Sequence, residues 1–240
     1  MKIEIASLED AQELVEIYRY YVEKTAITFE YEVPSVEEFK QRMVHVMEKY
    51  PYLIAKENDQ IVGYAYASCF KNRVAYDWCV ETSIYVNYDL KRCGIGKKLY
   101  LALEKALKAQ HITNLNACIS SPIENDEYLD TNSIDYHHHL GYQMIGKFHQ
   151  CGYKFNRWYD MVWMEKFIGE HLENQLPIIE FKKIKDQIDE LVTALLEEKK
   201  NSFDENRKVK IANIDLEELN NIELQQLQVR ISKILVERTK

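Results

Sequence analysis

The sequence predicts an α/β domain followed by a helical tail, and three observations favour this organisation. Strand-like and helix-like segments alternate along the first two thirds of the chain, as in domains whose helices cover a sheet. Within them, a loop with two glycines joins a strand to a helix near residue 94. From Glu170 onward, by contrast, the chain has no glycine and is dominated by Leu, Ile, Glu, Lys, Gln and Asn. We therefore expect an α/β body over residues 1–169 and a tail over residues 170–240.

Hydrophobic spacing and capping signals justify each element of the body. Residues 2–6 alternate polar and apolar side chains, which is typical of a short strand. Ser7 and Ser35 each precede acidic residues that complete a capping signal, so we expect a helix after each of them. Apolar runs on both sides of the turn at 57–60 predict a pair of strands. In order, the expected elements are strand 2–6, a helix from Ser7 through Val22, a helix from Ser35 through Met47, strands 52–56, 61–70 and 79–86, helix 94–110, strand 114–119, helix 133–140, and strands 142–151 and 158–167.

The composition excludes several classes of protein. With 31 basic and 39 acidic side chains the formal net charge is -8, whereas a nucleic-acid binder should carry a basic surface. No apolar run approaches the roughly 20 residues of a membrane helix, and the first residues lack the apolar stretch of a signal peptide. The five cysteines include no Cys-x-x-Cys pair, which argues against a disulfide scaffold or a zinc knuckle. We therefore expect a cytoplasmic protein that binds neither nucleic acid nor membrane.

The segment with the most chemical information joins the strand 79–86 to the helix 94–110. Backbone N–H groups at a helix start have no intrahelical partner and carry partial positive charge, and glycines allow a phosphate to approach them closely. Gly94 and Gly96 stand at this start, surrounded by Lys91, Arg92, Lys97 and Lys98. The segment therefore indicates a pyrophosphate site, although two glycines that only form a tight turn explain the same spacing. It is neither a dinucleotide-binding fingerprint, which needs a third glycine, nor a P-loop.

This segment resembles the acetyl-CoA loop of GNAT-type N-acetyltransferases, whose pattern is Gln/Arg-x-x-Gly-x-Gly/Ala, with Lys91 here at the first position. The wider sequence is similar to the phosphinothricin and methionine-sulfoximine N-acetyltransferase branch of that family. The matching segments keep the family's order over nearly all of residues 1–169, and the tail lies outside the resemblance. They are residues 28–30, 63–67, 73–78, 80–81, the glycine loop, 133–142, 152–154 and 157–158.

The resemblance implies the GNAT fold, a mixed and mostly antiparallel sheet. Its fourth and fifth strands, here about residues 79–86 and 114–120, are expected to splay apart and to admit the pantetheine arm of acetyl-CoA. Backbone groups of Ile84, Tyr85 and Val86 would pair with that arm. The pyrophosphate would sit on the glycine loop, which consists of Lys91, Arg92, Cys93, Gly94, Ile95, Gly96 and Lys97.

Glu81 is the expected catalytic base. Taken alone, a strand carboxylate more often faces solvent, but the resemblance places a base at this position. An acid flanked by Val80 and Ile84 in an apolar strand is also partly desolvated, which raises its pKa toward a useful range.

His137 is expected, by resemblance, to act as the acid toward the leaving thiolate or as an orienting group, with Tyr136 as a competitor for the acid role. The run His137-His138-His139 suggests a metal site, but consecutive helical residues point about 100° apart, so the three do not share one ion. We expect no metal.

The resemblance also assigns substrate-binding residues. Arg73 is expected to clamp a substrate carboxylate, and Tyr76, Phe29 and Glu30 to line the same pocket. Lys71 replaces a second family arginine, which leaves the exact substrate open.

The segment before the last short helix departs from the family pattern. An acidic insert over residues 124–130 precedes the helix, and Asp130 stands where the family has a cofactor-binding asparagine. Either Asn132 or Ser133 takes over that contact with acetyl-CoA, or the contact is lost.

The tail contains two apolar stripes at helical spacing, which predict amphipathic helices over about residues 178–199 and 215–238. Each stripe is too narrow to be stable alone in water, so the helices are expected to pack on each other, on the body or on another chain. Docking on the body is the simpler interpretation, and recognition of a partner is the alternative.

Together these features lead to a functional hypothesis. The resemblance implies an acetyl-CoA-dependent N-acetyltransferase that acts on the amine of a small amino-acid-like molecule, by direct attack in a ternary complex. Two alternatives remain open: an acetyl-CoA sensor that engages a partner through its tail, or an acetyltransferase for peptide or antibiotic amines. The resemblance also implies a homodimer.

Overall fold

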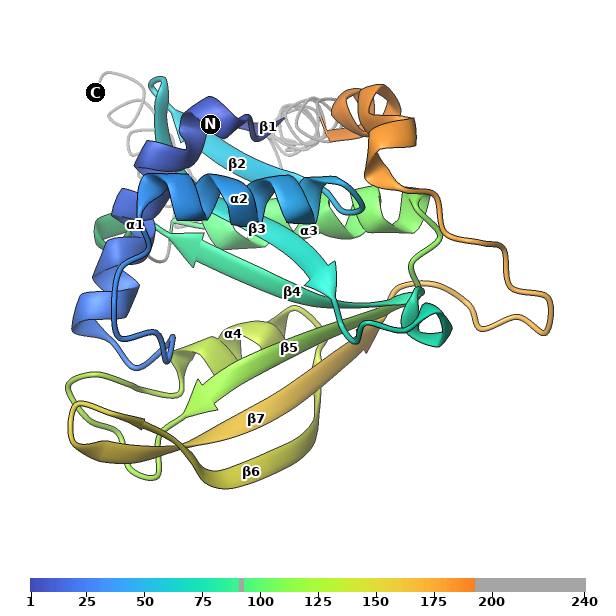
Figure 1. The fold of residues 1–240 in the computed structure, drawn as a ribbon. Coiled ribbons are helices and arrows are strands. Elements are labelled where there is room, and N and C mark those ends of the chain that lie inside the picture. Colours follow the sequence, from blue (N-terminus) through green and yellow to red (C-terminus); the bar gives the residue numbers. More distant parts are fainter. Residues whose placement is uncertain (91–92, 193–240) are drawn as a thin grey trace, which may run out of the picture. The chain divides into compact units, whose positions relative to one another are not determined.

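The computed structural model of the chain describes residues 1–90 and 93–192 (Figure 1). Its strands are β1 (Lys2–Ile5), β2 (Tyr52–Glu57), β3 (Gln60–Cys69), β4 (Cys79–Val86), β5 (Asn114–Ser121), β6 (Gln143–Lys154) and β7 (Arg157–Phe167). They form a seven-stranded sheet in the order β1-β2-β3-β4-β5-β7-β6. All neighbouring strands pair antiparallel except β4 and β5, which are parallel. The predicted mixed, mostly antiparallel sheet is therefore confirmed.

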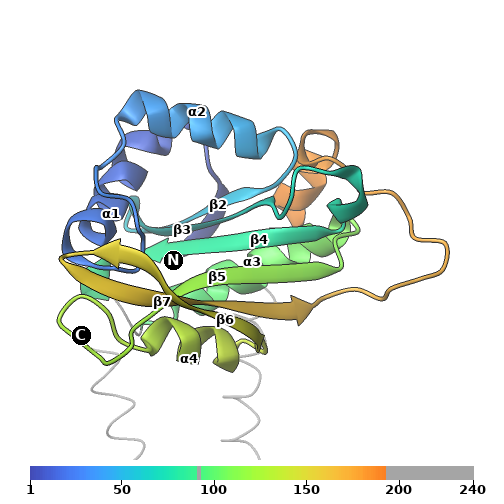
Figure 2. The ribbon, with the colours of Figure 1, turned by 60° about the horizontal axis from the view of Figure 1, so that its bottom comes forward.

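Helices cover both faces of this sheet. They are α1 (Ala11–Lys24), α2 (Val36–Met47), α3 (Ile95–Ala109) and α4 (Asn132–His139), with short 3₁₀ helices at Leu8–Asp10, Val74–Tyr76 and Tyr88–Leu90. Figure 2 shows α1 and α2 on one face and α3 and α4 on the other. We call these the α1/α2 face and the α3/α4 face.

The strands β4 and β5 separate after a short stretch of pairing. Their ladder joins Cys79, Val80 and Glu81 to the first three residues of β5 and ends at the pair Glu81–Asn116. Beyond this pair β4 continues to Val86 and β5 to Ser121 without pairing to each other. The predicted splay of the fourth and fifth strands is thus present, and we call the point after Glu81–Asn116 the fork.

Local sequence signals explain where several elements begin and end. The Ser35 hydroxyl accepts a hydrogen bond from the Glu38 N–H at 3.1 Å, as its capping signal predicts. Asn58 and Asp59 adopt positive φ angles of 51° and 63° and form a two-residue hairpin between β2 and β3. The expected end of β6 at residue 151 was too early. The strand runs to Lys154 because the hairpin turns at Phe155–Asn156, where an aromatic residue gives no turn signal.

Each face of the sheet has its own hydrophobic core. On the α1/α2 face, tyrosines dominate, and the rings of Tyr18, Tyr21 and Tyr64 surround Tyr85 with centroid distances of 4.9, 5.1 and 5.4 Å. On the α3/α4 face, aliphatic side chains of α3 pack on β3, β4 and β5. The two cores fix the sheet between them, so the fork lies on a rigid support.

The start of the predicted tail packs on the body. Residues 181–192 are helical, and Phe181, Ile188 and Val192 are buried in the same core as α3. The Gln110 side chain donates to the carbonyl oxygen of Ile179 at 2.7 Å, which anchors the preceding segment. The described residues, 1–90 and 93–192, belong to one compact unit. The end of the first expected tail helix and the whole second one, 215–238, lie outside the described residues.

No helix within residues 1–90 and 93–192 is both long and apolar enough to cross a membrane.

Candidate active site

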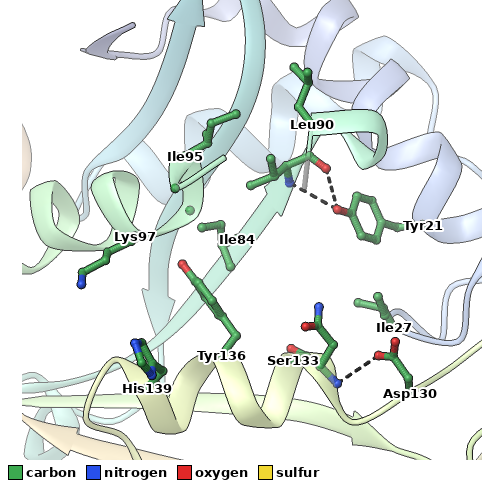
Figure 3. Close-up of a pocket in the computed structure, with 14 residues that line it drawn as sticks. Tyr21, Ile27, Ile84, Leu90, Ile95, Lys97, Asp130, Ser133, Tyr136 and His139 are labelled. Carbon is green, nitrogen blue, oxygen red and sulfur yellow. Dashed lines mark hydrogen bonds between the residues drawn. The ribbon is translucent and has the colours of Figure 1, made fainter. Parts of the chain in front are cut away.

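A cavity of about 600 Å³ lies between the separated end of β4, the start of α3 and the helix α4 (Figure 3). Its lining is largely apolar along β4 and becomes polar toward α3 and α4. The lining residues are Tyr21, Ile27, Ile84, Val86, Leu90, Gly94, Ile95, Gly96, Lys97, Asp130, Asn132, Ser133, Tyr136 and His139. The cavity therefore offers an apolar channel that ends at a helix N-terminus.

The start of α3 supplies the polar end of this cavity. Gly94 precedes the helix with a φ of 77°, a left-handed conformation that glycine adopts without strain. The first N–H groups of the helix have no intrahelical acceptor and carry partial positive charge. Lys97 adds a full charge beside them. This arrangement suits a pyrophosphate. Lys91 and Arg92, assigned to the same loop, lie outside the described residues.

Position 96 requires glycine because the Tyr136 side chain approaches it closely. A Cβ atom built on it would lie 2.7 Å from the Tyr136 hydroxyl oxygen and 3.4 Å from the Ile84 side chain. In Figure 3, Tyr136 extends from α4 toward Ile84 and the start of α3. A side chain at position 96 would therefore displace Tyr136 from the cavity wall.

Strand β4 directs alternate side chains to opposite faces. Ile84 and Val86 line the cavity on the α3/α4 face, whereas Tyr85 packs in the tyrosine core on the other face. The Tyr21 hydroxyl donates to the Val86 carbonyl oxygen at 2.5 Å and accepts from its N–H at 3.4 Å (Figure 3). Tyr21 thus holds both backbone groups of Val86, which were expected to face a bound pantetheine.

Glu81 lies at the fork on the α1/α2 face. It is the last residue of β4 that pairs with β5, and its partner is Asn116. Burial raises the pKa of the Glu81 carboxyl above its ordinary value, and the Lys71 ammonium partly opposes this shift. Burial also raises the pKa of the Cys118 thiol to about 12, with a contribution from the Glu81 charge. A partly desolvated carboxylate with a raised pKa is suited to accept a proton.

His137 does not line the cavity. Its side chain is buried, its Nδ1 lies 2.7 Å from the Ser133 carbonyl oxygen, and its Nε2 lies 2.9 Å from the Tyr100 hydroxyl. Burial lowers the pKa of His137 to about 4, and the bond to Ser133 only partly opposes this. His137 is therefore neutral near pH 7, and both of its nitrogens are engaged inside the protein.

The neighbouring Tyr136 does line the cavity. Its hydroxyl is buried and has no hydrogen-bond partner among the residues that the structure describes. A buried polar group without a partner is costly, and a catalytic role is one of the explanations for such a group in a native structure. Of the two adjacent aromatic residues on α4, the one that faces the cavity is Tyr136.

The residues expected to bind the amine substrate lie in two loops, one between β3 and β4 and one between α1 and α2. Arg73 is exposed and precedes the 3₁₀ turn Val74–Tyr76. Tyr76 is also exposed, and its ring lies 5.9 Å from that of Phe70. The cation whose charge acts on Glu81 is Lys71. Arg73 and Tyr76 thus stand in one exposed turn directly after Lys71.

Phe29 and Glu30 lie in the loop between α1 and α2. The Phe29 ring packs so closely on Gly152 that a Cβ atom there would overlap it. Glu30 accepts a hydrogen bond from Arg42 at 2.7 Å. Both side chains are therefore already engaged in contacts within the protein.

No group of three or more His, Cys, Asp or Glu side chains that would hold a metal ion occurs in the described part of the chain.

Comparison with known proteins identifies the family. The sequence profile described as an acetyltransferase (GNAT) domain matches residues 3–163. The chain belongs to the GNAT acetyltransferase family. This acetyltransferase is 32% identical over 168 residues to a phosphinothricin N-acetyltransferase of Streptomyces viridochromogenes, a match that covers 70% of this chain and 88% of that protein. It is 28% identical over 174 residues to an L-methionine sulfoximine/L-methionine sulfone acetyltransferase of Salmonella typhimurium, covering 71% and 96%.

A solved structure leads to the same family. A GNAT phosphinothricin acetyltransferase from Sinorhizobium meliloti in complex with AcCoA matches with a TM-score of 0.66 and 32% identity, covering 73% of this chain and 95% of that one. The GNAT fold and the acetyltransferase class expected from the sequence are thereby confirmed.

Most residues assigned to acetyl-CoA from the sequence of this acetyltransferase line the cavity. They are Ile84, Val86, Gly94, Ile95, Gly96, Lys97, Asn132 and Ser133. Cys93 is exposed in the loop, and neither it nor Tyr85 is among the lining residues. Sequence reasoning missed Tyr21, Ile27 and Leu90, because their apolar spacing is the same as that of ordinary core residues.

Proposed function

We propose that this GNAT acetyltransferase transfers the acetyl group of acetyl-CoA to the α-amine of a small amino-acid-like molecule. The observation that carries the proposal is the position of Glu81, at the fork and on the opposite face of β4 from the cavity. A donor in the cavity and an amine beside Glu81 would meet where the strands separate. The relatives named for phosphinothricin and for methionine sulfoximine, which are amino-acid analogues, support this substrate class.

The cavity fits the two chemically different parts of acetyl-CoA. The uncapped N–H groups at the start of α3, together with Lys97, suit the pyrophosphate. The apolar side chains of Ile84 and Val86 suit the pantetheine arm. Asn132 and Ser133, at the start of α4, offer polar groups on the opposite wall. We assign all of these residues to acetyl-CoA.

The transfer needs a neutral amine and a stabilised leaving group. In the proposed reaction Glu81 accepts a proton from the substrate ammonium, and the neutral nitrogen attacks the carbonyl carbon of the thioester. The C–S bond then breaks, and the sulfur takes a proton from the Tyr136 hydroxyl, which regains one from the acetylated nitrogen. His137 keeps the orienting role, since both of its nitrogens are engaged. Holding both substrates in one complex supplies much of the acceleration.

Arg73 is proposed to bind the carboxylate of the amino-acid substrate. Arg73→Ala should raise KM for phosphinothricin about 10- to 100-fold, because a charge-assisted, bidentate contact is lost. KM for acetyl-CoA should stay unchanged. Steady-state kinetics with phosphinothricin and with its analogue lacking the carboxylate measure the effect. Arg19→Ala, a change at an exposed arginine paired with Glu16 on α1, is the control. An equal rise in KM for both amines would contradict the assignment of Arg73 to the substrate carboxylate.

Lys71 is predicted to set the acid limb of the pH profile. The base must be ionised, so turnover rises with pH through the pKa of Glu81, which is already above its ordinary value. The Lys71 charge lowers this pKa. Lys71→Met should therefore shift the acid limb of kcat to higher pH, with the same plateau. A pH series on wild type and variant with one substrate measures the shift. An unchanged or lowered limb would contradict the proximity of Lys71 to the base.

Two further expectations from the sequence, a cytoplasmic location and a homodimer, stay predictions.

A further inference from the structure

Four buried polar side chains lie together beside the fork, on the α3/α4 face of the sheet. They are Thr82 on β4, Tyr100 on α3, His137 on α4 and Tyr142 just before β6, and each is at most 5% exposed. We call them the fork cluster. None of the four lines the cavity, yet Thr82 follows Glu81 in the chain and His137 follows Tyr136.

The first part of the fork cluster bridges the separating strands. The Thr82 hydroxyl donates to the carbonyl oxygen of Asn116 at 3.1 Å, at the residue where the β4–β5 ladder ends. The Asn116 side chain also bonds to β4, because its N–H donates to the Val80 carbonyl oxygen at 3.2 Å. A threonine hydroxyl has a single hydrogen, so the Tyr142 hydroxyl, 3.1 Å away, donates to Thr82. Thr82 therefore adds a side-chain bond between the two strands at the position where the ladder ends.

The second part of the fork cluster connects α3 to α4. The Ser133 carbonyl only accepts, so the His137 Nδ1 at 2.7 Å carries the hydrogen. The neutral imidazole then has a lone pair on Nε2, and the Tyr100 hydroxyl donates to it at 2.9 Å. Every proton in this chain of bonds has one possible position. The start of α4, including the cavity residue Ser133, is thereby fixed to α3.

Ring packing joins the two parts. The Tyr142 ring meets the His137 ring edge-on at a centroid distance of 5.2 Å and an interplanar angle of 85°. It lies 6.1 Å from the Tyr100 ring. The fork cluster thus connects β4, α3 and α4, which are the three elements that carry Ile84, Gly96 and Tyr136 around the cavity.

We propose that the fork cluster is a positioning device for the transfer reaction, in which Thr82 sets the separation of β4 and β5 and so aligns Glu81 with Tyr136 across the fork. This inference rests on the proposed function. Hydrogen bonds are directional, and an unpaired group in this buried site would be costly, so the cluster allows one arrangement of the three elements. A packing role alone would require only apolar side chains of the same shape.

The test compares Thr82→Val with Thr82→Ser. Valine keeps the shape of threonine but removes the hydroxyl's bond to the Asn116 carbonyl and leaves the Tyr142 hydroxyl without its acceptor on Thr82, whereas serine keeps the hydroxyl. Thr113→Val is the matched control, because Thr113 is equally buried and its hydroxyl contacts the Trp78 carbonyl at 3.3 Å, at the other end of the β4–β5 ladder. For each protein, calorimetry gives Kd for acetyl-CoA, kinetics gives kcat, and thermal unfolding gives Tm.

We expect Thr82→Val to weaken acetyl-CoA binding and to lower kcat, for a combined loss of about 10- to 100-fold in kcat/KM for acetyl-CoA. Thr82→Ser should restore most of this activity, and Thr113→Val should lower Tm alone. If Thr82→Val keeps the wild-type Kd and kcat and loses as much Tm as the control, the fork cluster contributes only to core packing. That result would overturn the inference.

A second variant and a binding measurement without amine keep the test decisive. If Thr82→Val does not fold, Tyr142→Phe is measured instead, since it removes the hydrogen bond that orients the Thr82 hydroxyl toward Asn116. A smaller fall in affinity and kcat is then expected, and unchanged values would again overturn the inference. Binding of acetyl-CoA requires no amine, so if the wild type acetylates no amine, the proposed function fails while the Kd comparison still decides whether the fork cluster positions the cavity.

Discussion

Glu81→Gln should lower kcat by about 10²- to 10⁴-fold, the usual contribution of a general base, with little change in KM for acetyl-CoA. Glutamine has nearly the same shape but accepts no proton.

The raised pKa of Glu81 also has a consequence for stability. A carboxyl group whose pKa is higher in the folded than in the unfolded protein stabilises the fold at pH values below its pKa in the unfolded protein. This contribution to the free energy of unfolding is lost as the pH rises through the pKa in the folded protein. At neutral pH the buried charge is therefore a cost, and Glu81→Gln should have an equal or higher Tm.

The control for this prediction is Glu165→Gln. Glu165 on β7 pairs with Asn116 from the other side of β5, so its carboxylate is separated from β4 by the width of β5. It should retain nearly full turnover. If Glu81→Gln kept wild-type kcat with intact folding, or if both variants lost activity equally, Glu81 would not be the base.

Gly96→Ala is predicted to separate activity from stability. In an ordinary helix, replacing glycine by alanine stabilises by about 0.5–1 kcal/mol. Here the new methyl group would meet the Tyr136 hydroxyl at 2.7 Å, so the ring must move into the cavity or out of its position. We expect kcat/KM for acetyl-CoA to fall about 10- to 100-fold while the protein stays folded.

Steady-state kinetics and thermal unfolding measure this separation. Gly146→Ala is the control, because a Cβ atom there meets nothing within 4 Å. Wild-type kinetics in Gly96→Ala would mean that the Tyr136 ring yields freely, and the proposed role of its hydroxyl at the sulfur would have to be abandoned.

The glycine loop and the face on which Glu81 lies were predictable from the sequence because each depends on local rules. A helix start with glycines has uncapped N–H groups wherever it lies, and strand alternation alone puts Glu81 and Ile84 on opposite faces. Contacts between residues far apart in the sequence could not be predicted in this way. Nothing in the spacing of α1 distinguishes Tyr21, which reaches the Val86 backbone, from the core tyrosines beside it.

The assignment on α4 illustrates a second limit. Tyr136 and His137 are adjacent, and consecutive helical residues point about 100° apart, so only one of them faces the cavity. Which one does so depends on how the helix rotates about its axis when it packs, and the sequence does not encode that rotation locally. The resemblance favoured His137 for the acid or orienting role, whereas the side chain in the cavity belongs to Tyr136.

The tail shows a similar division. Its apolar stripe indicated an amphipathic helix, but the surface that buries Phe181 and Ile188 is made by residues far away in the chain. The carboxamide of Gln110, which is fully buried and bonds to the carbonyls of Lys49 and Ile179, anchors that contact. A glutamine at the end of a helix gives no sign of such a role in a single sequence.

The most direct test of the account is acetyl transfer to amino-acid analogues. Thiol release from acetyl-CoA is followed with phosphinothricin, methionine sulfoximine, ordinary amino acids, polyamines and aminoglycosides, and the products are weighed by mass spectrometry. We predict thiol release with the amino-acid analogues and a product heavier by one acetyl group on the α-amine. Thiol release confined to polyamines or aminoglycosides, or none with any amine while acetyl-CoA still binds, would contradict it.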